Sequence, residues 1–444
     1  MNVKNYDKTL GSYMPSFFYM NLDFEFYKAS CSIFNLNERD FSIFVHEYIH
    51  FLQDISSFAL MNNSYVYSEY IHAAVNYIRT LPIGEFDVPL KLPFNYGNVE
   101  LNQFVNNACM GSNDTVDIVV CNSVDTKRVK VPYRNNIVKE LVLPYIESTH
   151  KKKLFFGTYA VMESMAYLME KRMSKGFTPV PDYPYLSAQM VIEQRYPEFE
   201  KDDLNIIALC DISLQYSNPG WIFVSFLDMM KEIGFLPSDP HDLYIIANQL
   251  PVSQMGENTS FDNGIIEMAF MLTRRLKLYL SGSRYSGFHN IVNKYFGFGL
   301  RNRIQNKTFM LDLASAGYGK DNTVFFKTLN ELGSPIICDK YGDFYQIPYM
   351  NDNSDMFLST FPAIEQIFKC LSKGSDICEM IDMCEQTIQH AREIFGDSYA
   401  DYIPEINENC YDKPWCKINE EKLCPYALLW KHWGLSNYIP RIKN

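Results

Sequence analysis

The sequence predicts an α+β protein that is mostly α-helical, with a small N-terminal sheet followed by a large helical region. The 444-residue chain is 47% hydrophobic and 21% charged, as in globular proteins with a substantial core. Residues 8–36 alternate aromatic and polar positions, which is typical of one or two strands. Most of residues 176–444 place apolar side chains at helical spacing. Together, these three observations predict the fold class.

Two helices are expected directly after the N-terminal strands. The first should run from about residue 38 to 60, because Asn35 or Asn37 can cap its start and Glu38 and Asp40 place acids in its first turn. The second should cover residues 64–80, where apolar residues recur at helical spacing until prolines and a glycine interrupt them.

Residues 84–135 change to short runs rich in Pro, Gly and Asn, so we expect an inserted segment. Val116–Val120 and Val129–Val131 flank residues 125–127 and predict a hairpin that turns there. Further helices are expected near 155–175, 185–195, 203–216, 219–233, 241–249, 263–281, 287–296, 323–332, 361–372 and 378–396.

The pattern divides the chain into four parts. They are 1–83, with the sheet and first helix; 84–135, the insertion with its hairpin; 136–300, a helical part; and 301–444, a C-terminal helical region.

One motif in the first helix carries chemistry. His46 and His50 are four residues apart, so on a helix their imidazoles point to one place. Zn²⁺ binds imidazole nitrogen at about 2.0–2.1 Å and prefers tetrahedral coordination. Glu47 lies one step round the helix, where a general base could reach a water at the metal without binding the ion. The uncharged residues around them favour a buried metal site over two incidental histidines, because unpaired buried polar groups are costly.

A third ligand should come from a carboxylate in an apolar helix. Glu163 lies among Ala, Val and Met in residues 155–175, where an uncompensated charge would be unfavourable. Other acids also lie in or beside apolar runs and stay open as alternatives for this position: Glu267, Asp211 and Glu69. Asp54, one turn beyond His50, could either bond to a ligand imidazole or face solvent.

The H-E-x-x-H pattern of His46, Glu47 and His50 resembles the zincin metallopeptidases. Residues 155–175 look like the glutamate helix of the gluzincins, which implies a zincin-like catalytic core with Glu163 as third zinc ligand. The chain departs from that family at Tyr167, four residues after Glu163, where many gluzincins carry a further acid. The metzincin pattern fails, because Gln53 and Ser56 stand where it needs Gly and His.

Composition limits partners and location. The net charge of −12 argues against nucleic acid as a partner, and no apolar run is long enough for a membrane span. We see no apolar leader at the N-terminus. Eleven cysteines, an odd number, indicate reduced thiols and a cytoplasmic location. The C-terminal cysteines lack C-x-x-C spacing, so we expect buried free thiols there.

The sequence therefore predicts a cytoplasmic zinc-dependent peptidase acting on a peptide or protein, with Glu47 as general base. Two alternatives stay open. One is a zinc-stabilised binding or scaffold protein without catalysis, and the other is a zinc hydrolase of non-peptide amides. The sequence does not indicate an oligomeric state.

Overall fold

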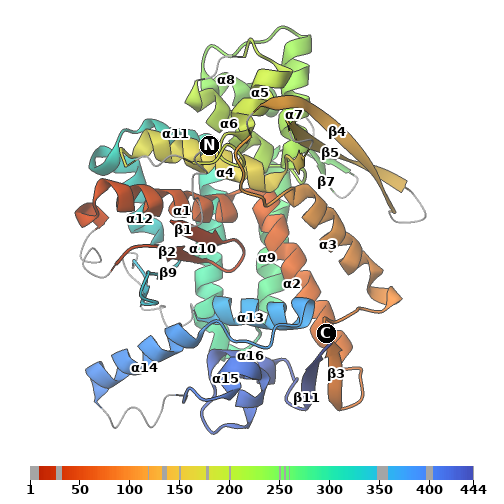
Figure 1. Ribbon diagram of the computed structural model, residues 1–444, viewed down its shortest axis with the longest axis vertical. Coiled ribbons are helices and arrows are strands. Elements are labelled where there is room, and N and C mark those ends of the chain that lie inside the picture. The colour runs from red at the N-terminus through yellow and green to blue at the C-terminus, as the bar shows by residue number, and fades with distance from the viewer. Residues whose placement is uncertain are drawn as a thin grey trace.

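The computed structural model describes residues 10–26, 33–118, 120–132, 138–149, 152–176, 180–199, 202–249, 252–254, 257–259, 261–347, 359–396 and 404–443. Within these ranges helices predominate and the strands form small sheets (Figure 1). The prediction of a mostly helical α+β protein is confirmed. None of the helices described there is both long enough and apolar enough to cross a membrane.

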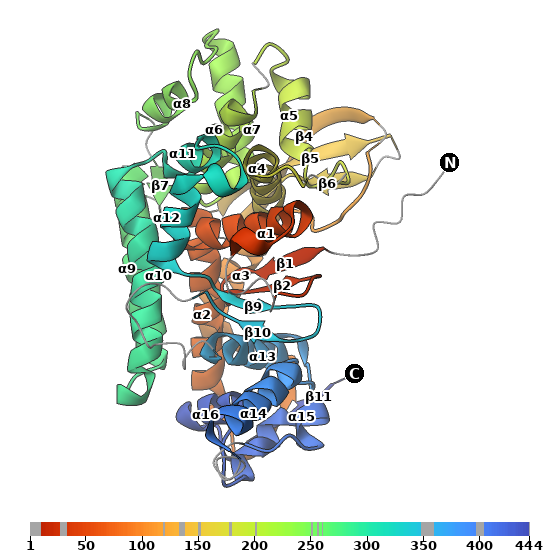
Figure 2. The ribbon, with the colours of Figure 1, turned by 90° about the vertical axis from the view of Figure 1, so that its left-hand side faces the viewer.

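The sheet near the N-terminus has four strands in the order β1-β2-β9-β10. The hairpin of β1 (Gly11–Met14) and β2 (Tyr19–Leu22) confirms the predicted N-terminal strands. β9 (Ile336–Cys338) pairs parallel to β2, and β10 (Phe344–Tyr345) pairs antiparallel to β9. Figure 2 shows the four strands beneath helix α1, so this sheet supports one side of the helix that carries His46 and His50.

The first predicted helix is shorter than expected. Helix α1 (Glu38–Ser56) ends four residues early, because Ser57 has an extended backbone and begins helix α2 (Phe58–Ile78). The Ser57 hydroxyl accepts a hydrogen bond from the amide of Leu60. At the other end Asn37, one of the two candidate caps, accepts a hydrogen bond from the amide of Asp40 and begins α1. Every residue of α1 from Phe41 onward is buried, which explains the scarcity of charged residues there.

Helices α4 (Thr158–Met173) and α10 (Ser286–Gln305) pack against α1. A Cβ atom on Gly299 of α10 would lie 1.9 Å from the carbonyl oxygen of Ile55, so only glycine permits this close crossing. Nε of Arg303, one turn further on, donates a 2.8 Å hydrogen bond to the carbonyl of Ser56. The C-terminal end of α1 is therefore held by α10.

The segment after α2 differs from its prediction in detail. It contains β3 (Gly84–Val88) and a helix that was not predicted, α3 (Gly97–Met110). The hairpin strands are β4 (Cys121–Pro132) and β5 (Val138–Ser148), and β6 (Lys153–Phe155) pairs with β5. The turn predicted at residues 125–127 is wrong, because these residues lie inside β4 and pair with residues 143–145.

The later helices lie close to their predicted ranges. They are α5 (Ser187–Arg195), α6 (Asp203–Leu214), α7 (Pro219–Glu232), α8 (Pro240–Ala247), α9 (Phe261–Tyr279), α12 (Thr323–Leu332), α13 (Thr360–Lys373) and α14 (Ile381–Phe395). The structure adds α11 (Phe309–Ser315), α15 (Asn409–Asp412), the 3-10 helix η9 (Pro414–Asn419), α16 (Pro425–His432) and β11 (Tyr438–Ile442), which pairs parallel to β3. Helices α13 to α16 gather at the opposite end of the molecule from β4 and β5 (Figure 1).

Candidate metal centre

The two histidines of α1 converge as their spacing predicts. Both side chains are buried, and their Nε2 atoms lie 3.1 Å apart. The rings are almost perpendicular, at 83°, with centroids 4.8 Å apart. Two imidazole nitrogens are thus directed to the same position in the space between α1 and α4.

Glu163 reaches this position from α4. Its Oε2 atom lies 3.2 Å from Nε2 of His46 and 3.3 Å from Nε2 of His50. A tetrahedral ion with bonds of about 2.05 Å needs ligand atoms about 3.3 Å apart, so all three separations fit one zinc-sized cation. Within the described ranges, these three residues form the one group of three or more His, Cys, Asp and Glu side chains close enough to share an ion.

The charges of the group favour a cation. Burial lowers the pKa of His46, but hydrogen bonds to Glu163 and Glu170 outweigh burial and raise it well above its ordinary value. Burial also opposes ionisation of Glu163, yet the charges of His50 and His46 and their hydrogen bonds hold its pKa far below the ordinary range. In the absence of metal, a proton on imidazole therefore balances the buried carboxylate.

A second acid on α4 fixes the orientation of His46. Nδ1 of His46 lies 2.9 Å from Oε2 of Glu170. An ionised carboxylate accepts hydrogen bonds and cannot donate them, so Nδ1 is the donor of this bond when Glu170 is ionised. Ser42 donates a 2.5 Å hydrogen bond to the other oxygen of Glu170, and its hydroxyl is 2.6 Å from that of Ser174. Glu170 thus leaves Nε2 of His46 directed at the site. No motif indicated Glu170, although its seven-residue spacing from Glu163 puts both acids on one face of the helix.

His50 is oriented by an amide. Its Nδ1 atom lies 2.8 Å from Oε1 of Gln53, and Nε2 of Gln53 donates a 3.1 Å hydrogen bond to the carbonyl of Met162. Gln53 therefore links α1 to the backbone of the residue before Glu163. Asp54 does not have this role. It accepts hydrogen bonds from the Tyr13 hydroxyl and the Ser16 amide, at 2.9 and 2.7 Å.

Glu47 is buried beside the group and does not belong to it. Burial raises the pKa of its carboxyl to about 7, with the two histidines lowering it and Glu163 raising it to smaller extents. Strand β1 confines the side chain, because a Cβ atom on Gly11 would lie 2.7 Å from Oε1 of Glu47. A carboxyl with a pKa near neutrality is suited to exchange protons.

The alternative third ligands lie elsewhere. Asp211 forms a buried ion pair with Arg303, at 2.5 and 2.7 Å, and accepts from the hydroxyl of Tyr244. Glu69 accepts from Asn102 at 2.7 Å. Glu267 is exposed on α9. None of these three acids belongs to the group formed by the described residues around His46 and His50.

Two tyrosines border the site. Tyr159 lies one turn before Glu163 on α4, and the Tyr185 ring centroid is 6.0 Å from that of His46. Burial, and then the charge of Glu163, raise the pKa of both phenols, so each keeps its proton. They are therefore hydrogen-bond donors. Tyr185 lies in a turn far from the motif along the chain, and no sequence pattern indicated it.

Comparison of the chain with protein families, with curated proteins and with solved structures gives no match to any of them. The class of site is therefore defined by its own geometry. It is a buried His-His-Glu group that could hold one metal ion.

Proposed function

We propose that this protein is a zinc-dependent peptidase with a zincin-like core. His46, His50 and Glu163 hold the zinc ion, and Glu47 is the general base. One observation carries the proposal. Two imidazole nitrogens and one carboxylate oxygen lie 3.1–3.3 Å apart, and a buried Glu47 with a near-neutral pKa lies beside them.

The number of ligands favours catalysis over a structural role. Structural zinc sites normally use four protein ligands, whereas catalytic sites use three and keep a position for water or substrate. The described residues supply three. When bound, zinc lowers the pKa of water to about 7 and polarises a carbonyl group.

The protein's own residues supply proton transfer and orientation. Glu47 takes a proton from the attacking water and returns it to the leaving amine. Glu170 and Gln53 hold the two imidazoles with their Nε2 atoms directed at the ion. Tyr159 and Tyr185 are protonated donors at the edge of the site, where negative charge develops on the carbonyl oxygen.

An extended peptide or protein segment is the proposed substrate. In the described residues β1 pairs only with β2, so its other edge offers backbone hydrogen-bonding groups. Gly11 on this strand is next to Glu47, so β1 lies beside the general base. A peptide strand can bind to such an edge.

Metal content and turnover together test the proposal. We expect about one zinc per chain in the wild type, close to none in His50→Ala or Glu163→Ala, and an unchanged content in the control Glu267→Gln. Glu47→Gln should keep its zinc and lose about 10²–10⁴-fold of the turnover of a peptide library.

Other outcomes favour the alternatives. If the wild type unfolds on zinc removal and Glu47→Gln changes nothing measurable, the protein is a zinc-stabilised scaffold. Hydrolysis of small amides without cleavage of any library peptide would instead indicate a non-peptide amidase. A wild type that takes up no zinc after reconstitution would refute the metal centre itself.

A further inference from the structure

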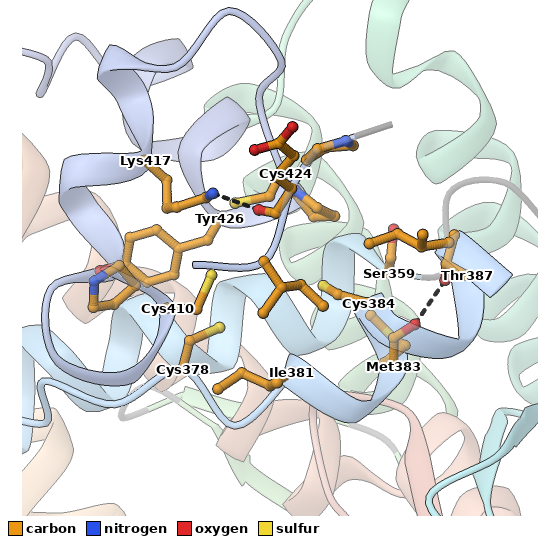
Figure 3. Close-up of a pocket in the computed structure, with 16 residues that line it drawn as sticks. Ser359, Cys378, Ile381, Met383, Cys384, Thr387, Cys410, Lys417, Cys424 and Tyr426 are labelled. Atoms are coloured by element: carbon orange, nitrogen blue, oxygen red, sulfur yellow. Dashed lines mark hydrogen bonds between the residues drawn. The ribbon is translucent and has the colours of Figure 1, made fainter. Parts of the chain in front are cut away.

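A second group of metal-binding side chains lies far from α1, among the C-terminal helices. Six of the eleven cysteines occur between residues 370 and 424. Four of them line one cavity of about 110 Å³ (Figure 3): Cys378, Cys384, Cys410 and Cys424. We refer to these four residues as the cysteine tetrad.

The tetrad is assembled from four separate segments. Cys378 lies in the loop before α14, Cys384 within α14, Cys410 in α15, and Cys424 at the N-cap of α16. The amide of Cys378 donates a 3.2 Å hydrogen bond to the carbonyl of Cys410, which joins two of these segments. All four side chains line the same cavity, so the fold brings these separate segments together around it.

Backbone amides point at two of the sulfur atoms. Sγ of Cys424 accepts a 3.5 Å hydrogen bond from the amide of Ala427 and interacts in the same way with the amide of Tyr426. Sγ of Cys378 interacts likewise with the amide of Met380. Hydrogen bonds from amides to sulfur stabilise thiolate ligands of iron–sulfur clusters and tune their potentials.

A buried cation lies at the same cavity. Lys417 lines this cavity (Figure 3) and is 1% exposed. Its ammonium group donates a 2.6 Å hydrogen bond to the carbonyl of Glu405 and pairs with Glu420. Its charge also acts on Cys384 and Cys424. Four thiolates around a metal cluster carry net negative charge, so a nearby ammonium group would stabilise them.

A single zinc ion and an iron–sulfur cluster require different separations of four cysteine sulfur atoms. Four thiolates on one zinc ion, with Zn–S bonds of about 2.3 Å, lie about 3.8 Å apart. Among the described residues, the one group whose ligand atoms lie close enough to share a single ion is that of His46, His50 and Glu163, so the tetrad does not form such a group. An iron–sulfur cluster separates its cysteines further, because iron and sulfide lie between them.

We propose that the cysteine tetrad binds an iron–sulfur cluster of the [4Fe–4S] type, in the cavity between α14, α15 and α16. The cluster links four chain segments at the end of the molecule opposite the β4–β5 hairpin. This inference is independent of the peptidase proposal, because the two sites share no residue.

The chain contains a matched control for this site. Cys416 lies on η9 between Cys410 and Cys424 in sequence, but it does not line the cavity, and its charged neighbours are Lys413 and Asp412. Replacing Cys416 with Ser should therefore leave the cluster intact.

The test uses full-length protein purified without oxygen and reconstituted with ferric iron, sulfide and a thiol, which reduces part of the iron as the cluster forms. We expect about four iron and about four sulfide ions per chain and visible charge-transfer absorption. Cys384→Ser and Cys410→Ser should each lose most of the iron and sulfide, whereas Cys416→Ser should keep both. Zinc bound at His46 and His50 should be unchanged in all three variants.

A labelling experiment on the wild type does not depend on the folding of any variant. Alkylation followed by peptide mass spectrometry should find the tetrad protected after reconstitution and Cys416 reactive in both states. Folded wild type that binds no labile sulfide would overturn the proposal. So would zinc as the metal on these thiols, or full iron and sulfide in both tetrad variants.

Discussion

Glu163 and Glu170 lie two turns apart on α4 and contact opposite nitrogens of one imidazole, that of His46. Glu163 is 3.2 Å from Nε2, and Glu170 is 2.9 Å from Nδ1. The same helix therefore supplies both a candidate ligand and the group that orients another ligand. This arrangement makes the contribution of each acid to metal binding separately measurable.

Replacing Glu170 with Gln should weaken zinc binding without abolishing it. The change removes the charge that orients His46, and loss of such a partner typically costs 10–100-fold in metal affinity, so we expect a loss of about that size. Competition with a chromogenic chelator measures it. Glu267→Gln is the control and should match the wild type. An unchanged affinity in Glu170→Gln would show that His46 does not need this contact.

Replacing Tyr185 with Phe should lower kcat by about 10²-fold and change zinc content little, because it removes one donor at the developing oxyanion. KM should change much less, since a donor of this kind acts mainly in the transition state. Steady-state kinetics on a cleaved library peptide give both values. The exposed Tyr341→Phe is the control. A rise in KM alone would assign Tyr185 to substrate binding.

Replacing Gly11 with Ala should reduce turnover by about 10-fold or more, because the added methyl group displaces Glu47, and small misplacements are costly. The contact involved is the 2.7 Å approach to Oε1 of Glu47. Zinc content should not change. Gly97→Ala is a fair control, since a Cβ atom there meets nothing within 4 Å. Equal turnover in both variants would mean that Glu47 adapts without loss.

Replacing Asp54 with Asn should change how stability depends on pH. Burial raises the pKa of Asp54 from 3.8 to about 7, so between these values the folded state binds more protons than the unfolded state. Wild-type stability therefore falls as the pH rises through this window. Between pH 5 and 7.5 the free energy of unfolding of the wild type should fall by about 2–3 kcal/mol relative to that of Asp54→Asn, as measured by urea unfolding. If the free energy of unfolding depends on pH in the same way in both proteins, Asp54 does not have the raised pKa.

The local part of the site could be predicted from the sequence. The spacing of His46 and His50 on one helix face is a property of the helix itself, and the apolar surroundings of Glu163 indicated a carboxylate with a buried partner. The structure brings these three residues together. Their role as zinc ligands stays a prediction until metal is measured.

The parts that depend on distant contacts could not be predicted. Tyr185 lies beside His46 but belongs to a turn more than 130 residues away along the chain. The periodicity of a sequence does not predict a contact between such distant residues. The tetrad has the same origin, because Cys378 and Cys424 line one cavity although they are far apart in the sequence. Helix ends were predicted less well than helices, as at Ser57, where one capping hydroxyl divides an apolar run into two helices.

The parallel pairing of β9 with β2 has a consequence for biosynthesis. Strand β9 begins at Ile336, more than 300 residues after β2 ends at Leu22, so that length of chain must leave the ribosome before β2 gains this neighbour. Until then β2 presents an open edge that can pair with other nascent chains. We therefore expect fragments released before residue 336 to depend on chaperones, and we expect α1 to reach its final support only late in synthesis.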